Sequence, residues 1–349
     1  MPDLVLYTVE EIRNWLLHNR TVEGLTEKIL SRARACAIIN NPFVQEKDPV
    51  MAAVLCDGKV AAYTTAFPEM INGQRMWWFS ALWCAPEFRG RGYGIVVIGG
   101  LAEVNGVDHC LDRWGASDTV GIFSYLGHNT IYTPRFIFGS RIDRTSLKGK
   151  LVFMVRSVQK YLRGLMRRNL GKEDYSLCYL PCIDDETYAF MQNQRRNDFF
   201  FHSQEILNWE LRYCFTISAP LIERVSSKSS FSSSEVSNSQ MYAVQVRDNT
   251  GIVGFYVLKR NDDCMHLLYL YFVESARSKV FASIKDHIKR MHTAQFDTDN
   301  GELATYIQKY FVFPKFRAVD ISFSFPASNE IPSGSTMQYG DGDNFAIVS

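Results

Sequence analysis

One stretch of the sequence, ALWCAPEFRGRGYGIVVIGGL at residues 81–101, constrains the fold more than any other. Its centre, RGRGYG at residues 89–94, places three alternating glycines and two arginines between two apolar runs. A dinucleotide-binding loop needs Gly-x-Gly-x-x-Gly, and a P-loop closes with Gly-Lys followed by Ser or Thr. Neither spacing is present, so the stretch belongs to neither of these nucleotide-binding motifs.

The arrangement that fits is a strand ending near Cys84, a loop, and a helix whose first turn spans residues 92–95. Such a loop directs several backbone N–H groups to one place, where the helix dipole adds partial positive charge. Glycines let an anion approach the backbone closely, and arginines add charge-assisted contacts. The stretch therefore predicts a pyrophosphate-binding loop; the alternative is an ordinary tight turn with two solvated arginines.

The residues around this loop alternate between strand and helix patterns. Turn signals at Asp57-Gly58 and Asn72-Gly73 separate β-rich runs, which predicts three antiparallel strands. Thr8 and Glu11 form a capping box that predicts the first helix. The expected elements are a helix from residue 8, a helix over 22–37, strands over 50–56, 59–67 and 75–84, a helix over 93–104, a strand over 107–115, a short helix over 119–126 and a strand over 135–142.

The second half of the chain repeats this order. Residues 241–274 again give three strands separated by turns, followed by a helix over 275–291, a strand over 294–297, a helix over 302–310 and a strand over 316–325. A repeat of about 190 residues indicates a duplicated domain, because solenoid repeats are only ~20–50 residues long. The predicted fold class is α+β: two tandem domains, each with a mixed, mostly antiparallel sheet flanked by helices.

The predicted domains are residues 1–145 and 173–349, joined by a basic linker helix over 146–172. Residues 141–172 contain ten Lys or Arg and a single acid, with apolar residues at helical spacing. We expect the apolar stripe of this helix to pack on a domain; contact with an anionic membrane surface is the alternative. A Ser-rich stretch at 226–239 predicts a flexible surface loop in the second domain.

Composition excludes several classes of function. The formal net charge of +1 gives no reason to expect nucleic-acid binding. No apolar run reaches the ~18 residues of a membrane span, and the start of the chain does not resemble a signal peptide. The eight cysteines lie mostly in apolar runs, and the pair Cys178 and Cys182 has no second pair nearby. We therefore expect a cytoplasmic protein with buried, reduced thiols and no metal.

With these elements in place, the loop resembles the acyl-CoA loop of the GNAT (GCN5-related N-acetyltransferase) superfamily. That loop follows the pattern Arg/Gln-x-x-Gly-x-Gly/Ala, and Arg89, Gly92 and Gly94 occupy its three defining positions. The order of elements from residue 8 to residue 142 is similar to the GNAT fold. The whole chain resembles tandem-domain bacterial GNAT proteins in which one copy binds CoA and the other has lost the loop.

The resemblance implies that acetyl-CoA, or another acyl-CoA, is the co-substrate of the N-terminal domain. Backbone groups of Trp83 and Cys84 would pair with the pantetheine arm, and an amide near Cys84 would polarise the thioester carbonyl. The Cys84 thiol is expected to pack, or to touch the pantetheine, rather than to act as a nucleophile. The implied pyrophosphate-binding residues are Arg89, Gly90, Arg91, Gly92, Tyr93 and Gly94.

The resemblance also implies a general acid for the departing thiolate. The family's stretch Asn-x-x-Ala-x-x-x-Tyr lies on a helix, and residues 118–125 keep its spacing and its tyrosine, with Asp and Gly in place of Asn and Ala. Tyr125 is therefore the candidate acid; the alternative is a tyrosine that packs its ring in the core. The base is less defined, because the strand before the loop has no carboxylate. The candidates are Asp112, His128 and Glu69, the last expected in the loop before the hairpin turn; ordered water could also take the proton.

The second copy departs from the GNAT pattern. No glycine lies between Gly254 and Gly301, and Glu274 adds a negative charge where pyrophosphate would bind. We expect no CoA there, but a structural role or a part in shaping the acceptor cleft. The aromatic segment Arg195–Tyr213 fits either the wall of that cleft or the packing of an amphipathic helix.

These features predict an acetyl-CoA-dependent N-acetyltransferase whose N-terminal domain is catalytic. An acceptor amine would attack the thioester directly, through a tetrahedral oxyanion. The favoured acceptor is a small-molecule amine, in particular an amino sugar or its nucleotide derivative. Two alternatives are kept: a non-catalytic acyl-CoA-binding or interaction module, and a related transferase of aminoacyl or fatty acyl groups.

Overall fold

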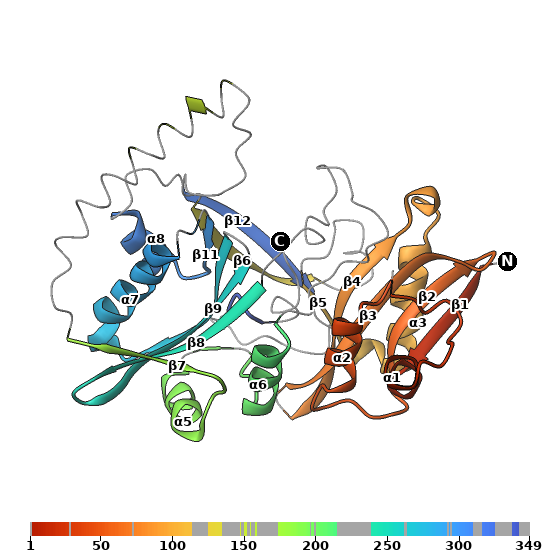
Figure 1. The fold of residues 1–349 in the computed structure, drawn as a ribbon, viewed down its shortest axis with the longest axis horizontal. Helices are drawn as coiled ribbons and strands as arrows, with labels where there is room; N and C mark the ends of the chain where they lie inside the picture. The colour runs from red at the N-terminus through yellow and green to blue at the C-terminus, as the bar shows by residue number, and fades with distance from the viewer. Residues whose placement is uncertain are drawn as a thin grey trace. The chain divides into compact units, whose positions relative to one another are not determined.

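The computed structural model describes most of the chain (Figure 1). The described residues are 2–27, 29–71, 73–113, 125–134, 147, 150, 151, 154, 158, 174–195, 197–198, 200–214, 239–261, 264–291, 293, 295–309, 316–324 and 337–341. The chain divides into two compact units. The first comprises Met1–Asn129, Arg196–Ser239 and Asp320–Ser349, and the second comprises Thr130–Arg195 and Gln240–Val319. This grouping differs from the predicted boundaries at residues 145 and 172.

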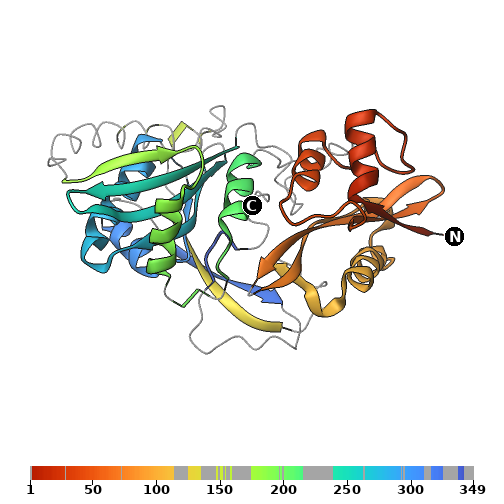
Figure 2. The same ribbon diagram turned by 90° about the horizontal axis from the view of Figure 1, so that it is seen from below.

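The first unit is built on a sheet in which β1 to β4 are antiparallel neighbours and β5 runs parallel to β4. Its elements are β1 (Asp3–Thr8), α1 (Val9–His18), α2 (Arg32–Ile39), β2 (Pro49–Cys56), β3 (Lys59–Ile71), β4 (Gln74–Cys84), α3 (Tyr93–Asn105) and β5 (Cys110–Arg113). Helices α1 and α2, in red, lie on one face of the sheet, and α3, in orange, covers the other face (Figure 2). The apolar strands are buried between these helix layers.

Most of the expected elements of the first copy are confirmed. Thr8 and Glu11 form the predicted capping box of α1, and the three predicted strands match β2, β3 and β4. Strand β1 was not expected. The helix predicted over 22–37 begins only at Arg32, because Gly24 adopts a φ of +71° and Ser31 caps the helix at that point.

The second unit repeats this arrangement around a five-stranded sheet of order β11-β10-β9-β8-β7. Its elements are β7 (Ser176–Leu180), α5 (Asp185–Gln194), β8 (Ser239–Asp248), β9 (Gly251–Asn261), β10 (Cys264–Phe272), α7 (Arg277–Arg290), β11 (Gln295–Asp297) and α8 (Gly301–Gln308). As in the first copy, the last strand is parallel to its neighbour and the others are antiparallel. The predicted duplication is therefore confirmed.

The first sheet and the first unit include elements from the second half of the chain, so the compact units do not follow the halves of the sequence. Helix α6 (Gln204–Arg212) follows α5 in the chain but belongs to the first unit. Strand β12 (Phe316–Ser324) pairs with β5 through Phe323 and Ser324, and the first sheet has the order β1-β2-β3-β4-β5-β12-β6. Strand β6 (Tyr125–Pro134) continues beyond Asn129 into residues of the second unit, where Tyr132 bridges to Thr298.

Several predictions concern parts of the chain outside the described residues. These are the strand over 135–142, the Ser-rich loop up to residue 238 and most of the basic segment over 146–172. Within that segment the described residues Leu147, Lys150, Leu151, Met154 and Val158 are helical and exposed. The predicted helix over 119–126 is wrong at its end, because residues 125 and 126 begin strand β6.

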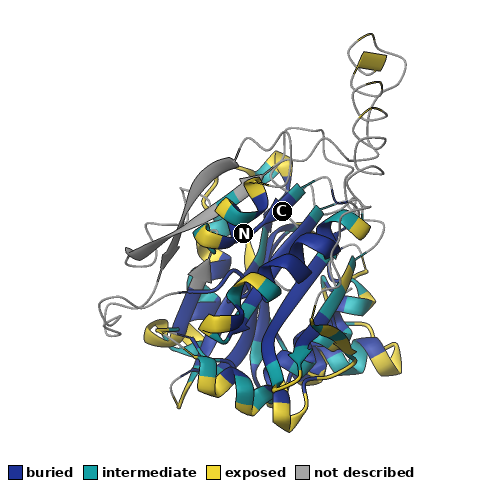
Figure 3. Cartoon of the chain, turned by 90° about the vertical axis from the view of Figure 1, so that its left-hand side faces the viewer, coloured by how far each residue is buried: buried dark blue, intermediate teal, exposed yellow. Residues whose placement is uncertain are grey.

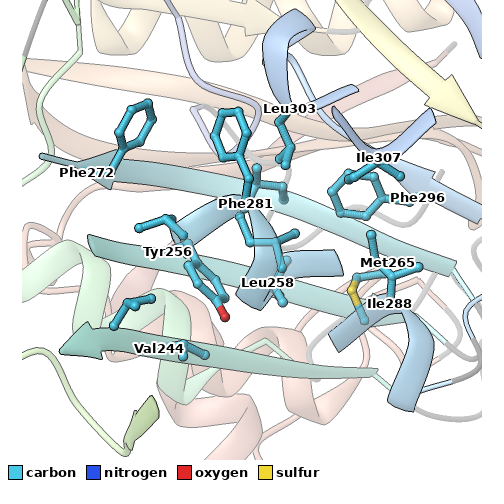
Figure 4. Packing of buried hydrophobic residues seen from close by; sticks show 14 of the residues in the cluster. Val244, Tyr256, Leu258, Met265, Phe272, Phe281, Ile288, Phe296, Leu303 and Ile307 are labelled. Carbon is cyan, nitrogen blue, oxygen red and sulfur yellow. The ribbon is translucent and has the colours of Figure 1, made fainter. Parts of the chain in front are cut away.

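Each unit has its own apolar core, and buried residues fill the strands and the inner sides of the helices (Figure 3). In the second unit, side chains of β8 to β11 interlock with those of α7 and α8 (Figure 4). All eight cysteines are free, but only Cys110 and Cys214 are buried as expected. Cys178 and Cys182 are exposed, and the other four are half-buried: Cys36, Cys56, Cys84 and Cys264. In the described part of the chain, no helix combines the length and apolar character that crossing a membrane requires.

Candidate active site

The glycine-rich loop forms an open cradle between β4 and α3. After Cys84 the chain makes a short 3-10 turn at Pro86–Phe88 and enters α3 at Tyr93. Gly90 and Gly92 have φ values of +77° and +80°, a conformation that is strained for any residue with a side chain. A Cβ atom added to either glycine would meet nothing within 4 Å. The backbone conformation requires these glycines, and the space in front of them is open.

The first turn of α3 supplies N–H groups to this cradle. Gly92 is the N-cap, and its carbonyl accepts the amides of Ile95 at 3.0 Å and Val96 at 3.2 Å. The amides of Tyr93 and Gly94 precede these bonds and have no acceptor within the helix. Free amides and the positive end of a 13-residue helix favour an anion at this point.

The arginines of the loop lie at its surface. Arg89 is exposed, and its Nε donates to the Cys84 carbonyl at 3.2 Å, which ties the loop to the strand end. The guanidinium of Arg91 lies over the Phe88 ring, 5.3 Å from its centroid. The nearby Cys56 thiol raises the pKa of Tyr93, and Arg91 opposes this effect.

Cys84 does not have the character of a nucleophile. Burial raises the pKa of its thiol, and the nearby Arg89 offsets this effect only in part. Because the thiolate is the reactive form of cysteine, a raised pKa leaves an unreactive thiol at neutral pH. The thiol contacts the Ala85 carbonyl at 3.8 Å.

Strand β4 carries a bulge just before the cradle. Ser80 pairs with Thr65 and Trp83 pairs with Tyr63, so Ala81 and Leu82 together face one residue of β3. Ala81 has a φ of +56°. The parallel pairing of β4 with β5 covers only Trp77 and Trp78 among the described residues. Beyond that point the described residues offer β4 no partner strand on this side, and an unpaired strand end is one that an extended ligand arm can join by backbone hydrogen bonds.

A buried ionic cluster lies farther back on the same strands. His202 stands between two carboxylates: its Nδ1 contacts Glu69 and its Nε2 lies 2.9 Å from Asp341. Burial lowers the pKa of His202, but Glu69 and Asp341 outweigh this effect and raise it well above the ordinary value. The other Glu69 oxygen accepts from Trp78 Nε1 at 2.8 Å. Glu69 thus lies on β3, not in a loop as expected; it is buried, and each of its oxygens already has a partner, which argues against a role as the base.

The aromatic segment before and within α6 packs in the core of the first unit. Trp209 donates to the Ala37 carbonyl at 2.9 Å and contacts Phe67 edge-on, while Phe200 contacts Trp78 at 5.2 Å between ring centroids. These contacts confirm core packing of the amphipathic helix. The ionic role of His202 had no signal in the sequence, because its two partners lie more than a hundred residues away.

The predicted cofactor-binding residues 83–94 run without a break from the end of β4 through the loop into the first turn of α3. The structure does not show the catalytic candidates beside that loop. Tyr125 is the first residue of strand β6 and not part of a helix, and His128 lies on the same strand. Asp112 lies on β5, opposite Ser324. The side chains of these three residues lie outside the described part. Within that part, no group of three or more side chains is arranged to hold a metal ion.

The corresponding junction of the second copy is shorter and contains no glycine. Strand β10 ends at Phe272, a single turn at Glu274–Ala276 follows, and α7 begins at Arg277. Arg277 forms ion pairs with Glu274 and, at 2.9 Å, with Glu302. Side-chain charges of the protein itself therefore occupy the start of α7.

No protein-family model and no curated protein matches the sequence. Among solved structures, Saccharomyces cerevisiae N-myristoyltransferase with bound myristoyl-CoA matches 100% of this chain and 85% of its own, with a TM-score of 0.50 and 12% identity. A putative acetyltransferase from Pyrococcus horikoshii has a TM-score of 0.49 and 11% identity, covering 97% and 93% of the two chains. A tandem GNAT protein from the clavulanic acid pathway has a TM-score of 0.48 and 10% identity, covering 94% and 100%.

At these identities the similarity concerns the fold and not the substrate. The yeast match extends over the whole chain. The protein thus shares its fold with that N-myristoyltransferase, as a duplicated α+β arrangement of two sheets flanked by helices.

Proposed function

We propose that the N-terminal copy is an acyl-CoA-dependent N-acyltransferase that moves an acetyl group from acetyl-CoA to an amine. The observation that carries the proposal is the cradle between β4 and α3. Two glycines held at positive φ, with open space in front of them, adjoin a bulged strand whose residues beyond Trp78 have no partner on the β5 side within the described part of the chain. Amides at a helix N-terminus suit a pyrophosphate, and a strand edge suits an extended pantetheine arm.

In this proposal the backbone binds the cofactor. The amides of residues 89–94 hold the pyrophosphate, and Trp83 and Cys84 pair with the pantetheine. An amide near Cys84 donates to the thioester oxygen and stabilises the oxyanion. The amine nitrogen attacks the carbonyl carbon, the carbonyl electron pair moves to oxygen, and collapse of the tetrahedral intermediate expels the CoA thiolate.

Two protons must move during this reaction. We assign the acid that protonates the thiolate to Tyr125, because residues 118–125 keep the spacing and the tyrosine of the family's Asn-x-x-Ala-x-x-x-Tyr stretch. With Glu69 engaged by His202 and Trp78, the proton of the attacking amine passes to ordered water, or to Asp112 or His128.

The favoured acceptor is a small-molecule amine, in particular an amino sugar or its nucleotide derivative, in the cytoplasm. The engagement of Glu69 favours one alternative, an acyl-CoA-binding module without turnover. Replacing Tyr125 with Phe separates the two functions. An enzyme would keep its affinity for CoA and lose most of its turnover, whereas a binding module would show no turnover before or after the change.

A matched pair of glycine variants tests the cradle. Gly92 and Gly73 both have a φ of +80° and open space for a Cβ atom, but Gly73 lies in the turn between β3 and β4. Gly92→Val and Gly73→Val therefore carry the same backbone strain, ~1–2 kcal/mol. We expect calorimetry to show at least a hundredfold loss of acetyl-CoA affinity for Gly92→Val and none for Gly73→Val. Equal affinities in the two variants would refute the proposal.

The acyl group is open to direct identification. Native mass spectrometry of the purified protein reports the mass of any acyl-CoA that it retains. Acetyl-CoA supports the acetyl assignment. A long-chain acyl-CoA would instead favour transfer of a fatty acyl group, which needs the same cradle but a deeper acyl pocket.

A further inference from the structure

The bulge of β4 holds an alanine in an unfavourable conformation. Ala81 has a φ of +56°, in the left-handed region that a residue with a Cβ seldom adopts. Such a conformation persists only where the surrounding structure fixes it. The contacts of the preceding residue, Ser80, show how this is done.

Two threonine hydroxyls hold the peptide group between Ser80 and Ala81. The Ser80 carbonyl accepts from Thr65 Oγ1 at 3.0 Å and from Thr64 Oγ1 at 3.3 Å, and both bonds are buried. Because a peptide group is planar, fixing this oxygen also fixes the direction of the Ala81 N–H. The orientation of the bulge is therefore set from strand β3.

Arg34 of helix α2 orients these hydroxyls in turn. Its Nη2 donates to Thr65 Oγ1 at 2.8 Å and to Ser80 Oγ at 2.6 Å, and the residue is 5% exposed. A guanidinium only donates, so Thr65 Oγ1 must accept from it and direct its own proton to the Ser80 carbonyl. The guanidinium also lies over the Phe67 ring, 5.5 Å from the centroid, which limits its movement.

The second copy keeps a bulge but not this network. In β10 the extra residue is Leu268, between the pairs Leu267–Leu258 and Tyr269–Val257. Leu268 is not among the described residues with positive φ. The pair before the bulge is serine with threonine in the first copy and leucine with leucine in the second. The polar network therefore accompanies the copy that has the open cradle.

We propose that Arg34 is a positioning residue for acyl transfer: through Thr65 and Ser80 it fixes the bulge, and so the direction of the amides of residues 82–84 that face the thioester. This inference rests on the proposed function. A buried guanidinium is costly to keep out of water, and fixing a single backbone geometry is a role for which buried polar groups are retained. Arg34 touches neither cofactor nor acceptor in this role.

The test is the infrared spectrum of bound acetyl-CoA labelled with ¹³C at its carbonyl. In the wild-type protein, donation to the thioester oxygen lowers the carbonyl stretching frequency relative to free acetyl-CoA. In Arg34→Met we expect the frequency to return toward the free value, while the dissociation constant changes less than threefold because the pyrophosphate cradle is untouched. Arg34→Lys keeps the charge and should restore part of the shift.

Two further variants make the test decisive. Thr65→Val removes only the relaying hydroxyl and should move the frequency in the same direction even if Arg34→Met does not fold. Arg32→Met alters an arginine of the same helix that pairs with Glu27 and should leave the spectrum unchanged. If the carbonyl frequency in both Arg34→Met and Thr65→Val were as low as in the wild-type protein, the inference about Arg34 would be overturned and the proposed function would stand. A wild-type protein that binds no acetyl-CoA would instead overturn the proposed function, and the inference with it.

Discussion

The two copies differ most at one junction between a strand and the following helix. This is the junction of β4 with α3 in the first copy and of β10 with α7 in the second. In the first copy residues 85–92 form this junction, with glycines at positive φ and open space before them. In the second copy only residues 273–276 are available, and Arg277 with its two glutamates occupies the helix start. The bulge before the junction is present in both.

This difference separates the features that build the fold from those that would bind a ligand. Strand order and bulge are present in a copy without a cradle, so we expect that these features do not by themselves provide ligand binding. Anion binding needs free amides and room for the ligand, and the second junction offers a glutamate instead. We therefore expect one cofactor site per chain.

The largest expected effect concerns the buried histidine of the first unit. His202→Gln leaves Glu69 and Asp341 buried without their shared cation, and breaking a buried ionic group of this kind costs about 3–5 kcal/mol. Urea unfolding monitored by tryptophan fluorescence measures the change. His18→Gln, on the exposed end of α1, is the control and should change stability by less than about 0.5 kcal/mol. A loss below about 1 kcal/mol for His202→Gln would argue against an ionic cluster.

The next effect concerns the number of cofactor sites. Titration calorimetry should give one acetyl-CoA per chain, and Gly90→Val, at a φ of +77°, should weaken binding about a hundredfold, or ~2.8 kcal/mol. Gly58→Val, at +72° in a hairpin turn, is the matched control. Arg277→Met in the second copy should change neither affinity nor stoichiometry. A stoichiometry of two acetyl-CoA per chain would contradict the expectation that only the first copy binds the cofactor.

A smaller effect on stability is expected when alanine replaces a glycine that contacts another side chain, and its sign depends on whether that side chain can move. A Cβ atom at Gly254 would lie 2.4 Å from buried Val280, and one at Gly100 would lie 2.5 Å from Leu4, which is 42% exposed. Gly254→Ala should cost about 1–3 kcal/mol, because the core of the second unit cannot yield. Gly100→Ala should be neutral or stabilising by ~0.5–1 kcal/mol, because Leu4 can turn away and alanine favours a helix. Equal losses in denaturant unfolding would contradict this distinction.

The smallest effect is in the pH dependence of stability. His202 has a raised pKa, so its contribution is complete below about pH 6.5 and is lost as pH rises through the folded-state value. His287 is buried and bonded to Tyr179 and Tyr256, and burial lowers its pKa. Its contribution is complete above about pH 6.5 and is lost as pH falls.

Unfolding curves across pH measure both losses of stability, the alkaline limb caused by His202 and the acid limb caused by His287. Each loss amounts to at most about 1.36 kcal/mol for each pH unit between the folded and unfolded pKa values. His202→Gln should flatten the alkaline limb and His287→Gln the acid limb. If each variant flattened the limb expected for the other, His202 would be neutral and His287 charged in the folded protein, the reverse of their assigned states.

Local patterns in the sequence predicted the elements that depend on neighbours in the chain. The capping box at Thr8 and the turns at Gly58 and Gly73 are satisfied within a few residues, and all three lie where expected. The helix over 22–37 was overextended because its apolar spacing continues through residues that Gly24 and Ser31 place outside the helix. Tyr125 was assigned to a helix by motif spacing alone, although the structure places it on a strand.

One part of the candidate site could be predicted from local sequence, and another part could not. The cradle was predictable because a positive φ at Gly90 and Gly92 is a local requirement that only glycine meets without strain. The network of Arg34, Thr65 and Ser80 was not, because its members come from α2, β3 and β4 and carry no fixed spacing.

The sequence by itself determined the duplication, most of the strands and helices, and which copy carries the glycine loop, since these follow from periodicity, turns and glycine positions. The tertiary structure alone decided that β12 and helix α6 join the first sheet and the first unit, and that His202 meets Glu69 and Asp341. Contacts between residues far apart in the chain depend on which surfaces pack together, and packing is chosen by the summed burial of many side chains rather than by any local pattern.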